Sequence, residues 1–207
     1  MRYHKIPDET VRRLPGYLRG LFFLSRAGNK DISSRNLADF LGVHHWQVRK
    51  DFSYFGTFGT PGVGYNINKL IKEVRRILKL DVLHRVALVG VGNLGAALLE
   101  YGGFGEYAFE IVAAFDNNPK KIGKTVGKVV IEDVSRLKTI SKRNIRIAVV
   151  AVPSKAVQET ADVLVKANVR GILNFASSYL VVPKKVKVIS MNIAVELARL
   201  PYYIVTP

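Results

Sequence analysis

Apolar residues recur with a helical period through the first third of the chain, and glycine or polar residues break the period at a few points. The spacing of leucines from Pro7 onward predicts a first helix, for which Gly28 supplies the stop. Two shorter helices are predicted on either side of Gly42, which separates them. Ser33 or Ser34 can cap the earlier of the two, since a serine oxygen accepts a hydrogen bond from a free helical N–H group.

The stretch "GTFGTPGVGY", residues 56–65, interrupts this period with four glycines and few apolar residues. It has too little apolar surface to pack, so we expect an exposed loop or wing there. The next stretch, "NINKLIKEVRRILKL", is strongly amphipathic. It predicts a further helix, with Asn66 or Asn68 as its cap.

Short, continuously apolar runs replace the helical period after His84, and helical segments separate several of them. The expected strands are RVALVG, FEIVAAFD, VVIE, IRIAVVAVP, VRGILNF and VKVIS. Buried strands that alternate with helices predict an α/β fold with a parallel, doubly wound sheet. The tail begins as the helical segment NIAVELARL, which Pro201 should end or kink.

Composition bounds the class of protein, and charge is its unusual feature. The 207 residues suggest one or two small domains of ordinary globular composition. Lys and Arg outnumber Asp and Glu by 32 to 16, and the net charge of +16 favours an anionic partner, nucleic acid first and an anionic membrane second. A generally basic surface, as in ribosomal or thermophilic proteins, is the alternative. Residues 1–84 hold 15 basic and 7 acidic residues and residues 85–207 hold 17 and 9, an excess of 8 in each part, so charge does not locate the site.

Cysteine is absent, so the chain can form no disulfide, thiol nucleophile or cysteine-ligated metal site, and we expect no metal. The first ten residues lack an apolar segment that could act as a signal peptide. No apolar run approaches the roughly 20 residues that cross a bilayer. We therefore expect a cytoplasmic protein without a membrane partner.

A dinucleotide-type glycine signature lies in "VALVGVGNLGAAL", where Gly90, Gly92 and Gly95 have G-x-G-x-x-G spacing between a predicted strand and a predicted helix. In that context Gly90 permits a tight turn, Gly92 lets the backbone approach a pyrophosphate, and Gly95 lets helix and strand pack closely. The helix N-terminus then presents free N–H groups to the phosphates. A tightened turn without a ligand, or one that binds coenzyme A, is the alternative.

Asp116 ends the second predicted strand of this region, 21 residues beyond Gly95. A carboxylate there can accept hydrogen bonds from the adenosine ribose hydroxyls and repel a 2′-phosphate. The position therefore favours NAD(H) over NADP(H), although Lys120 and Lys121 lie close in sequence.

Groups for hydride-transfer catalysis are missing beyond the glycine signature. The only Tyr-x-x-x-Lys spacing, from Tyr65 to Lys69, precedes the first predicted strand, and no histidine follows His84, where the nucleotide fold is expected to begin. Hydride transfer usually needs a general acid–base group beside the nicotinamide. We therefore expect no catalytic residues and a protein that is not an enzyme. A small NAD-dependent dehydrogenase, or a nucleotide-binding domain that acts on protein partners, is the alternative.

The stretch "NLADFLGVHHWQVRK" fits a helix–turn–helix with its turn at Gly42. Its inward positions are Leu37, Ala38, Leu41, Val43 and Val48. The front and outer side of its second helix carries His44, His45, Trp46, Gln47, Arg49 and Lys50. Arg and Lys can donate to guanine and Gln can pair bidentately with adenine, so this side can read a major groove. The aromatic residues Phe52 and Phe55 are expected to pack in the core instead.

Together, "QVRKDFSYFG", "GVGY" and "GVGNLG" resemble the Rex family of redox-sensing transcriptional repressors. Further stretches that carry the resemblance are YLRGL, EYGGFGEYAFEIVAAFDNNPKKIG, AVPSKAVQETADVLVKANVRGILNFA and NIAVELARL. The resemblance implies a homodimer with a winged-helix DNA-binding domain at 1–83, a Rossmann NAD(H)-binding domain at 84–190 and a C-terminal helix at 191–207 that swaps into the partner subunit. It also implies binding to palindromic double-stranded operator DNA when NAD⁺ dominates and release when NADH binds.

The resemblance and the motifs together assign residues to each role. The expected cofactor-binding residues are Gly90, Val91, Gly92, Asn93, Leu94, Gly95, Tyr101, Asp116, Asn117, Val152, Pro153, Asn174, Phe175 and Ala176. The expected DNA-binding residues are Ser33, Ser34, His44, His45, Trp46, Gln47, Arg49, Lys50, Ser53, Tyr54, Gly62 and Tyr65.

Four positions match the family's redox switch, namely Arg19, Tyr101, Asn192 and Ile193. The family implies that the first-helix arginine pairs alternately with the tyrosine and with an aspartate ahead of the swapped helix. Asn192 stands at that last position, and an amide cannot form an ion pair with Arg19. Two prolines also depart from the family pattern: Pro61 lies in the wing where relatives often carry Arg or Lys, and Pro201 shortens the swapped helix.

Overall fold

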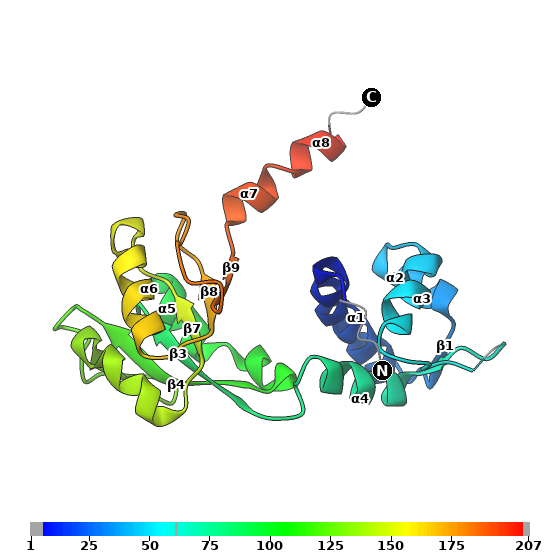
Figure 1. Cartoon of the computed structure of the whole chain (residues 1–207), viewed down its shortest axis with the longest axis horizontal. Helices are drawn as coiled ribbons and strands as arrows, with labels where there is room; N and C mark the ends of the chain where they lie inside the picture. The colour runs from blue at the N-terminus through cyan, green and yellow to red at the C-terminus, as the bar shows by residue number, and fades with distance from the viewer. Residues whose placement is uncertain (1–5, 61, 205–207) are drawn as a thin grey trace. The chain divides into compact units, whose positions relative to one another are not determined.

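A computed structural model describes residues 6–60 and 62–204, and the chain folds as two compact units (Figure 1). The first comprises Met1–Val82 and the second Leu83–Pro207. The first unit is helical and carries a small wing, and the second is built on a mainly parallel sheet. The predicted α/β class, with a winged-helix unit ahead of a Rossmann-type unit, is confirmed.

Helix α1 (Asp8–Arg26) buries the apolar stripe that its sequence predicted. Leu18 and Leu21, near the middle of that stripe, are fully buried. Pro15 lies inside the helix without ending it, which the sequence analysis did not consider. Gly28 follows the last turn at φ +85°, a left-handed conformation that costs glycine little, so the predicted stop is confirmed.

Helices α2 (Ser34–Leu41) and α3 (His45–Ser53) form the expected helix–turn–helix. Ser33 is the cap of α2, because its hydroxyl oxygen accepts a hydrogen bond from the Asn36 amide at 3.0 Å. Gly42 makes the turn between the helices with φ +67°. The local signals of the sequence therefore place both ends of α2 correctly.

A two-stranded antiparallel sheet, which the sequence analysis missed, joins β1 (Asp31–Ile32) to β2 (Tyr65–Asn66). Strands of two residues are too short to show an alternating pattern. The wing lies between α3 and β2, and it turns back through a β-bridge from Thr60 to Gly64. Pro61, at which the sequence departs from the family pattern, lies outside the described residues.

The amphipathic helix predicted after the wing is α4 (Ile67–Ile77). Its cap is Asn66 rather than Asn68, because the Asn66 side-chain oxygen accepts a hydrogen bond from the Lys69 amide at 3.1 Å. The helix buries Leu70 and Val74 in the core of the first unit.

Seven strands form the sheet of the second unit, in the order β5-β6-β4-β3-β7-β8-β9. Their bounds are β3 (His84–Val89), β4 (Phe109–Asp116), β5 (Thr125–Val126), β6 (Val129–Asp133), β7 (Ile147–Val150), β8 (Gly171–Asn174) and β9 (Lys187–Ser190). Neighbours from β6 to β9 pair in parallel, and β5 pairs with β6 in the antiparallel direction. The earliest strand, β3, lies in the middle and later strands are added on both sides, as in a doubly wound sheet.

Helical segments connect these strands. Their bounds are α5 (Asn93–Glu100), η1 (Gly102–Tyr107), η2 (Val134–Arg143), η3 (Ser154–Ala156) and α6 (Val157–Lys166), where η marks a 3₁₀ helix. Successive residues of β3 enter different cores, since Ala87 and Val89 face one side of the sheet and Val86 and Leu88 face the other.

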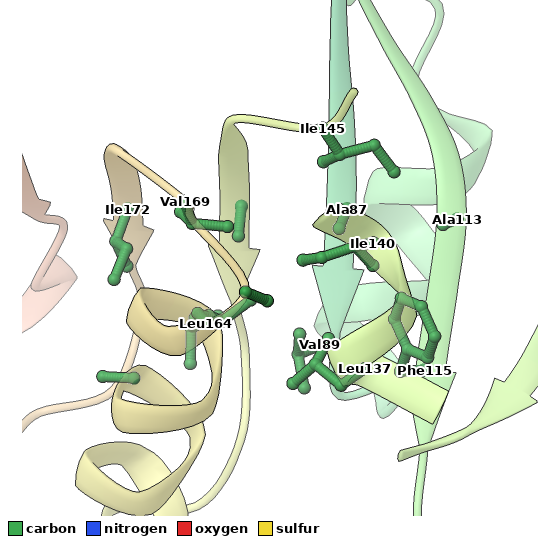
Figure 2. Close-up of a cluster of buried hydrophobic side chains, with 14 of the residues drawn as sticks. Ala87, Val89, Ala113, Phe115, Leu137, Ile140, Ile145, Leu164, Val169 and Ile172 are labelled. Atoms are coloured by element: carbon green, nitrogen blue, oxygen red, sulfur yellow. The ribbon is translucent and has the colours of Figure 1, made fainter. Parts of the chain in front are cut away.

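The core on one side of the sheet is closed by η2 and α6 (Figure 2). Leu137 and Ile140 of η2 lie beside Val89 and Phe115 of the strands, and Leu164 of α6 packs into the same cluster. The apolar runs that predicted buried strands supply the side chains of this core. Their packing holds the sheet in place, and the loops that connect strands to helices extend from its edges.

Within the described residues, two short helices follow β9, namely α7 (Ile193–Leu197) and α8 (Leu200–Ile204). The break between them falls just before Pro201, whose missing N–H group cannot continue the hydrogen bonds of α7, so the predicted interruption is confirmed. Neither helix buries a residue within the described chain. Within residues 6–60 and 62–204, no helix is long and apolar enough to cross a membrane.

Candidate nucleotide site and nucleic-acid interface

The glycine loop between β3 and α5 is made of close backbone contacts that leave one position open. Gly90 has φ +93°, and a Cβ there would collide with the carbonyl oxygen of Ala151. A Cβ at Gly95 would collide with the carbonyl oxygen of Gly90, so α5 packs directly on the loop. Apart from its chain neighbours and the backbone of α5, no described atom lies within 4 Å of a Cβ built at Gly92. Gly92 therefore leaves space for a ligand where α5 begins and its N–H groups are free.

Asp116 lies buried at the carboxyl end of β4 and holds the glycine loop. Its Oδ2 accepts a hydrogen bond from the Val91 amide and its Oδ1 one from the Asn118 amide, both at 2.8 Å. Burial alone would raise the pKa of Asp116, but these hydrogen bonds and the nearby Lys121 ammonium outweigh it and lower the pKa below its ordinary value. Asp116 is thus a charged acceptor beside the loop, as contact with a ribose requires.

Lys121 is a residue of this site whose role the sequence left open. Its Nζ donates a hydrogen bond to the Val91 carbonyl oxygen at 2.8 Å and lies 3.5 Å from Oδ2 of Asp116. The ammonium therefore ties the connection after β4 to the glycine loop and partly neutralises Asp116. Proximity in sequence was the only signal for this residue, and it did not show that the side chain turns back toward the loop.

The Asp116→Asn variant is expected to bind NADPH about tenfold more tightly relative to NADH, because an amide does not repel a 2′-phosphate and Lys121 is then available to pair with it. Fluorescence titration with both reduced nucleotides measures the ratio. The double variant Asp116→Asn/Lys121→Met should lose the gain. If the ratio of NADPH to NADH affinity is unchanged in Asp116→Asn, the roles assigned to Asp116 and Lys121 are wrong.

The other predicted cofactor residues lie at the carboxyl edge of the sheet or next to it. Asn93 and Leu94 begin α5 and are exposed, and Asn117 is exposed directly after β4. Val152 and Pro153 follow β7, next to the glycine loop, since the Ala151 amide donates to the Val89 carbonyl oxygen. The parallel register of β3, β4 and β7 brings these loops to one edge.

The prediction that Asn174 contacts the cofactor stays a prediction. It is fully buried at the end of β8, and its amide is bonded within its own loop. Its Oδ1 accepts from the Ala176 amide at 2.9 Å, and its Nδ2 donates to the carbonyl oxygens of Ala176 and Ser178 at 3.2 and 3.0 Å. Asn174 therefore shapes the loop, and the half-buried Phe175 is the neighbour left to face a ligand.

Tyr101 directly follows α5 and is 61% exposed. Its ring packs edge-on against Phe104, with 5.1 Å between ring centroids, and covers Gly103, where a Cβ would collide with the ring. Of its expected partners, Arg19 is exposed on α1 and Ile193 is exposed on α7. All three side chains are thus accessible in a single chain.

Helix α3 presents an exposed polar face, as expected of a helix that enters a groove. Its exposed side chains are His45, Trp46, Arg49, Lys50 and Ser53, and His44 is exposed just before it. The His44 and Trp46 rings stack with 6.0 Å between centroids. Gln47 differs from these because it is half-buried at the side of the helix that faces α1.

A cavity of about 460 Å³ lies between α3 and the wing. The predicted DNA-binding residues that line it are Ser33, Ser34, Arg49, Ser53, Gly62 and Tyr65. The Nη1 atom of Arg49 lies 3.4 Å from the Ser34 hydroxyl oxygen. Hydroxyl and guanidinium groups gathered in this way are typical partners of DNA phosphates.

The prediction that Tyr65 contacts DNA also stays a prediction. It is only 8% exposed, and its ring lies 5.5 Å from that of the buried Phe52. Burial raises the pKa of Tyr65. Tyr65 is therefore a core residue of which one edge lines the cavity, whereas Tyr54 and Phe55 are half-buried at the end of α3.

Asp51, which no sequence motif indicated, joins the inner face of α3 to α1 and is 1% exposed. Its oxygens accept hydrogen bonds from the Thr10 hydroxyl at 2.9 Å and the Tyr17 hydroxyl at 2.6 Å. Arg13 donates from Nε at 2.7 Å and from Nη2 at 2.8 Å. A carboxylate in a helix ordinarily indicates a solvated face, so no local signal distinguished this one.

Comparisons with known proteins match residues in both units of the chain. A family model described as "CoA binding domain" matches residues 81–178, and one described as "Putative DNA-binding protein N-terminus" matches residues 5–53. The redox-sensing transcriptional repressor Rex of Desulfitobacterium hafniense is 45% identical over 207 residues, which covers 100% of this chain and 99% of the relative. The Rex protein of Carboxydothermus hydrogenoformans is 44% identical and covers 99% of both chains. The chain belongs to the Rex family.

Solved Rex structures extend the match to the fold. The Rex-family repressor RSP in complex with β-NAD⁺ and operator DNA has a TM-score of 0.89 at 35% identity, covering 96% of this chain and 92% of that one. RSP in complex with β-NADH has a TM-score of 0.88 at 34% identity, covering 96% and 94%. The Rex relatives are named transcriptional repressors, and this chain is accordingly not an enzyme.

Asn192, the expected switch residue that departs from the family pattern, has a structural role in this chain. Its Oδ1 accepts hydrogen bonds from the Ala194 amide at 3.0 Å and the Val195 amide at 3.3 Å, so it caps α7. An aspartate could cap the helix in the same way and would add a negative charge. The replacement therefore keeps the start of α7 and removes the charge.

Proposed function

We propose that this chain is a transcriptional repressor that senses the ratio of NADH to NAD⁺. It binds palindromic operator DNA with NAD⁺ or without NADH, and NADH binding to the second unit releases it. The observation that carries the proposal is the pairing of two sites in one chain, the open glycine loop beside the ionised Asp116 and the exposed basic face of α3. RSP, which has been solved with NAD⁺ and operator DNA and also with NADH, supports it.

The signal for release must arise near the nicotinamide ring. NADH and NAD⁺ differ by one charge and by the shape of that ring, so only differential affinity at the ring can shift the conformational equilibrium. We assign this role to Arg19, Tyr101, Asn192 and Ile193, all accessible or half-accessible in a single chain. Because Asn192 carries no charge, the response in this chain does not use an ion pair at that position.

A gel shift of labelled operator DNA titrated with NADH and, separately, with NAD⁺ tests the function directly. NADH should release the DNA at concentrations where NAD⁺ leaves it bound. Equal effects of the two nucleotides would reject redox sensing, and release by neither would reject nucleotide control altogether.

Arg49→Ala is expected to weaken operator binding by about 5- to 150-fold, the loss of one good contact of about 1–3 kcal/mol in a groove. Affinity for NADH should stay within a few-fold, since Arg49 lies in the other unit. Lys72→Ala, which removes an equal charge from the exposed side of α4, is the matched control and should weaken binding much less. Equal losses in the two variants would show that only net charge matters.

Two exposed apolar surfaces in the second unit support a homodimer with an exchanged C-terminal helix. On α7 and α8 the exposed apolar side chains are Ile193, Val195, Leu197, Leu200, Tyr202, Tyr203 and Ile204. A trough of about 300 Å³ on one face of the sheet is lined by apolar residues that include Val86, Phe109, Ile111, Val149 and Leu173. Large exposed apolar patches are rare on soluble monomers, and a second copy of the chain that offers its own helix can cover these surfaces.

Deleting residues 193–207 is expected to convert the dimer into a monomer and to weaken operator binding strongly, since a palindrome needs two linked helices α3. Sedimentation velocity of the full chain and of the shortened chain measures the change. A shortened chain that remains dimeric would reject the exchanged helix.

We further propose that the protein acts in the cytoplasm, where chromosomal DNA and the nucleotide pool are both present.

A further inference from the structure

Gln47 on α3 contacts a residue of α1, Arg13, that no sequence motif singled out. The side chain of Gln47 is half-buried, and its amide end lies against the guanidinium group of Arg13. A guanidinium group has only donors, so the amide must turn its carbonyl oxygen toward it. In that orientation the oxygen accepts from Nη1 at 3.2 Å and from Nη2 at 2.9 Å.

The guanidinium group of Arg13 is itself held in place by Asp51. Its Nε and Nη2 atoms donate to the two carboxylate oxygens at 2.7 and 2.8 Å, which is the bidentate geometry that fixes an arginine most firmly. Asp51 also accepts from Thr10 and Tyr17, so the carboxylate cannot turn away without breaking these hydrogen bonds. The contact with Gln47 therefore rests on a buried and fixed cluster.

The contact with Arg13 limits the hydrogen bonds that the Gln47 side chain can form with a base. Its carbonyl oxygen has two lone pairs and already accepts from two N–H groups of Arg13. Two N–H donors of the amide remain. Bidentate pairing with adenine needs one donor and one acceptor, whereas guanine presents two adjacent acceptors, N7 and O6.

We infer that Arg13 is a positioning residue that fixes Gln47 as a donor, so that Gln47 selects guanine instead of adenine in the major groove. The inference rests on the proposed DNA binding and adds to it the base that this side chain recognises. It also revises the general expectation that glutamine pairs with adenine, because here the acceptor half of the amide is already bonded within the protein.

The test uses the full chain and a pool of DNA duplexes with randomised positions, from which the bound sequences are read. The position read by Gln47 is the one at which Gln47→Ala abolishes the base preference. The wild-type protein should select guanine there. Arg13→Lys keeps a positive charge beside Asp51, but one ammonium nitrogen replaces three guanidinium nitrogens. When it pairs with Asp51, it can supply at most one of the two hydrogen bonds that Gln47 accepts from Arg13. The freed amide should then shift the preference toward adenine by about tenfold, the usual size of discrimination by one bidentate pair.

Arg12→Lys is the matched control, because Arg12 neighbours Arg13 on α1 but is exposed and pairs with Asp8 at 2.9 Å. It should leave the base preference unchanged. A second measurement does not depend on the folding of any Arg13 variant. Replacing the selected guanine by 7-deazaguanine, which lacks the N7 acceptor, should weaken wild-type binding several-fold and leave binding by Gln47→Ala unchanged.

Selection of adenine by the wild-type protein at this position would overturn the inference, as would an unchanged preference in folded Arg13→Lys. If Gln47→Ala changes the base preference at no position of the selected DNA, the inference fails, while the proposed repressor function stands. If the wild-type protein retains no duplex even at low salt, where phosphate contacts are strongest, the proposed function itself fails.

Discussion

Replacing Asp51 by alanine is expected to lower the free energy of unfolding of the first unit by about 3–5 kcal/mol, the usual cost of removing one partner from a buried ion pair. The variant would leave Arg13, Tyr17 and Thr10 without the oxygens that they share. A buried donor that loses its acceptor retains its desolvation cost and gains nothing in return. The loss should therefore exceed that of any single exposed ion pair in this unit.

Chemical denaturation of the full chain, followed by fluorescence of the single tryptophan in α3, measures this change. Asp39→Ala is the matched control, since it removes the same charge from an exposed position on α2 and should cost little. Similar midpoints for the two variants would contradict the structural role of Asp51. Operator binding should fall with Asp51→Ala, because α3 loses its attachment to α1.

The same residue gives the first unit a dependence on acid. Burial opposes ionisation, but hydrogen bonds from Arg13, Tyr17 and Thr10 outweigh it and lower the pKa of Asp51. A group whose pKa is lower in the folded state contributes stability above its unfolded value, about 3.9, and that contribution is lost as the pH falls through the folded value. Asp51→Asn should thus be less stable at neutral pH and lose less stability on acidification.

Gly92→Val is expected to abolish NADH binding, with a loss of more than about 100-fold, or about 2.7 kcal/mol, while the protein remains folded. Gly92 has φ −77°, which a valine can adopt, and apart from its chain neighbours and the backbone of α5 no described atom lies within 4 Å of its added Cβ. The side chain would instead occupy the space through which a pyrophosphate approaches the first turn of α5. The variant should bind operator DNA normally and fail to release it on addition of NADH.

Gly95→Ala provides the opposite case, because its Cβ would collide with the backbone of Gly90 rather than with a ligand. We expect it to lower the melting temperature, whereas Gly92→Val should leave that temperature almost unchanged. Calorimetry and fluorescence titration of both variants separate the two effects. NADH binding that survives in Gly92→Val would show that the nucleotide does not cross the loop at this point.

Much of the fold and of the nucleotide site was predictable because its signals are local. Ser33 and Gly42 mark the ends of α2 through the hydrogen bond and the backbone conformation that each residue type favours. The apolar runs after His84 predicted the strands, since a strand buried on both faces needs apolar residues at every position. The glycine spacing predicted the loop because a Cβ would collide at Gly90 and Gly95.

The partners of polar side chains were not predictable in the same way. Asp51 contacts residues up to 41 positions away in sequence, and Lys121 reaches back 30 positions to the glycine loop. Asn174 and Tyr65 have residue types that suit a ligand or DNA equally well, and only packing showed that one is bonded within its loop and the other lies in the core. Residue type and spacing do not tell these outcomes apart.

By itself, the sequence determined the helices, the strands, the glycine loop and the basic face of α3, because each depends on periodicity or on the backbone freedom of single residues. The tertiary structure alone decided which donors and acceptors remain free for a ligand. The amide of Gln47 shows why: its sequence position makes it available to a base, but Arg13, brought close by the packing of α1 on α3, already binds its oxygen. A hydrogen-bonding group can form only as many hydrogen bonds as it has lone pairs and protons. Contacts within the fold use some of these before a ligand binds.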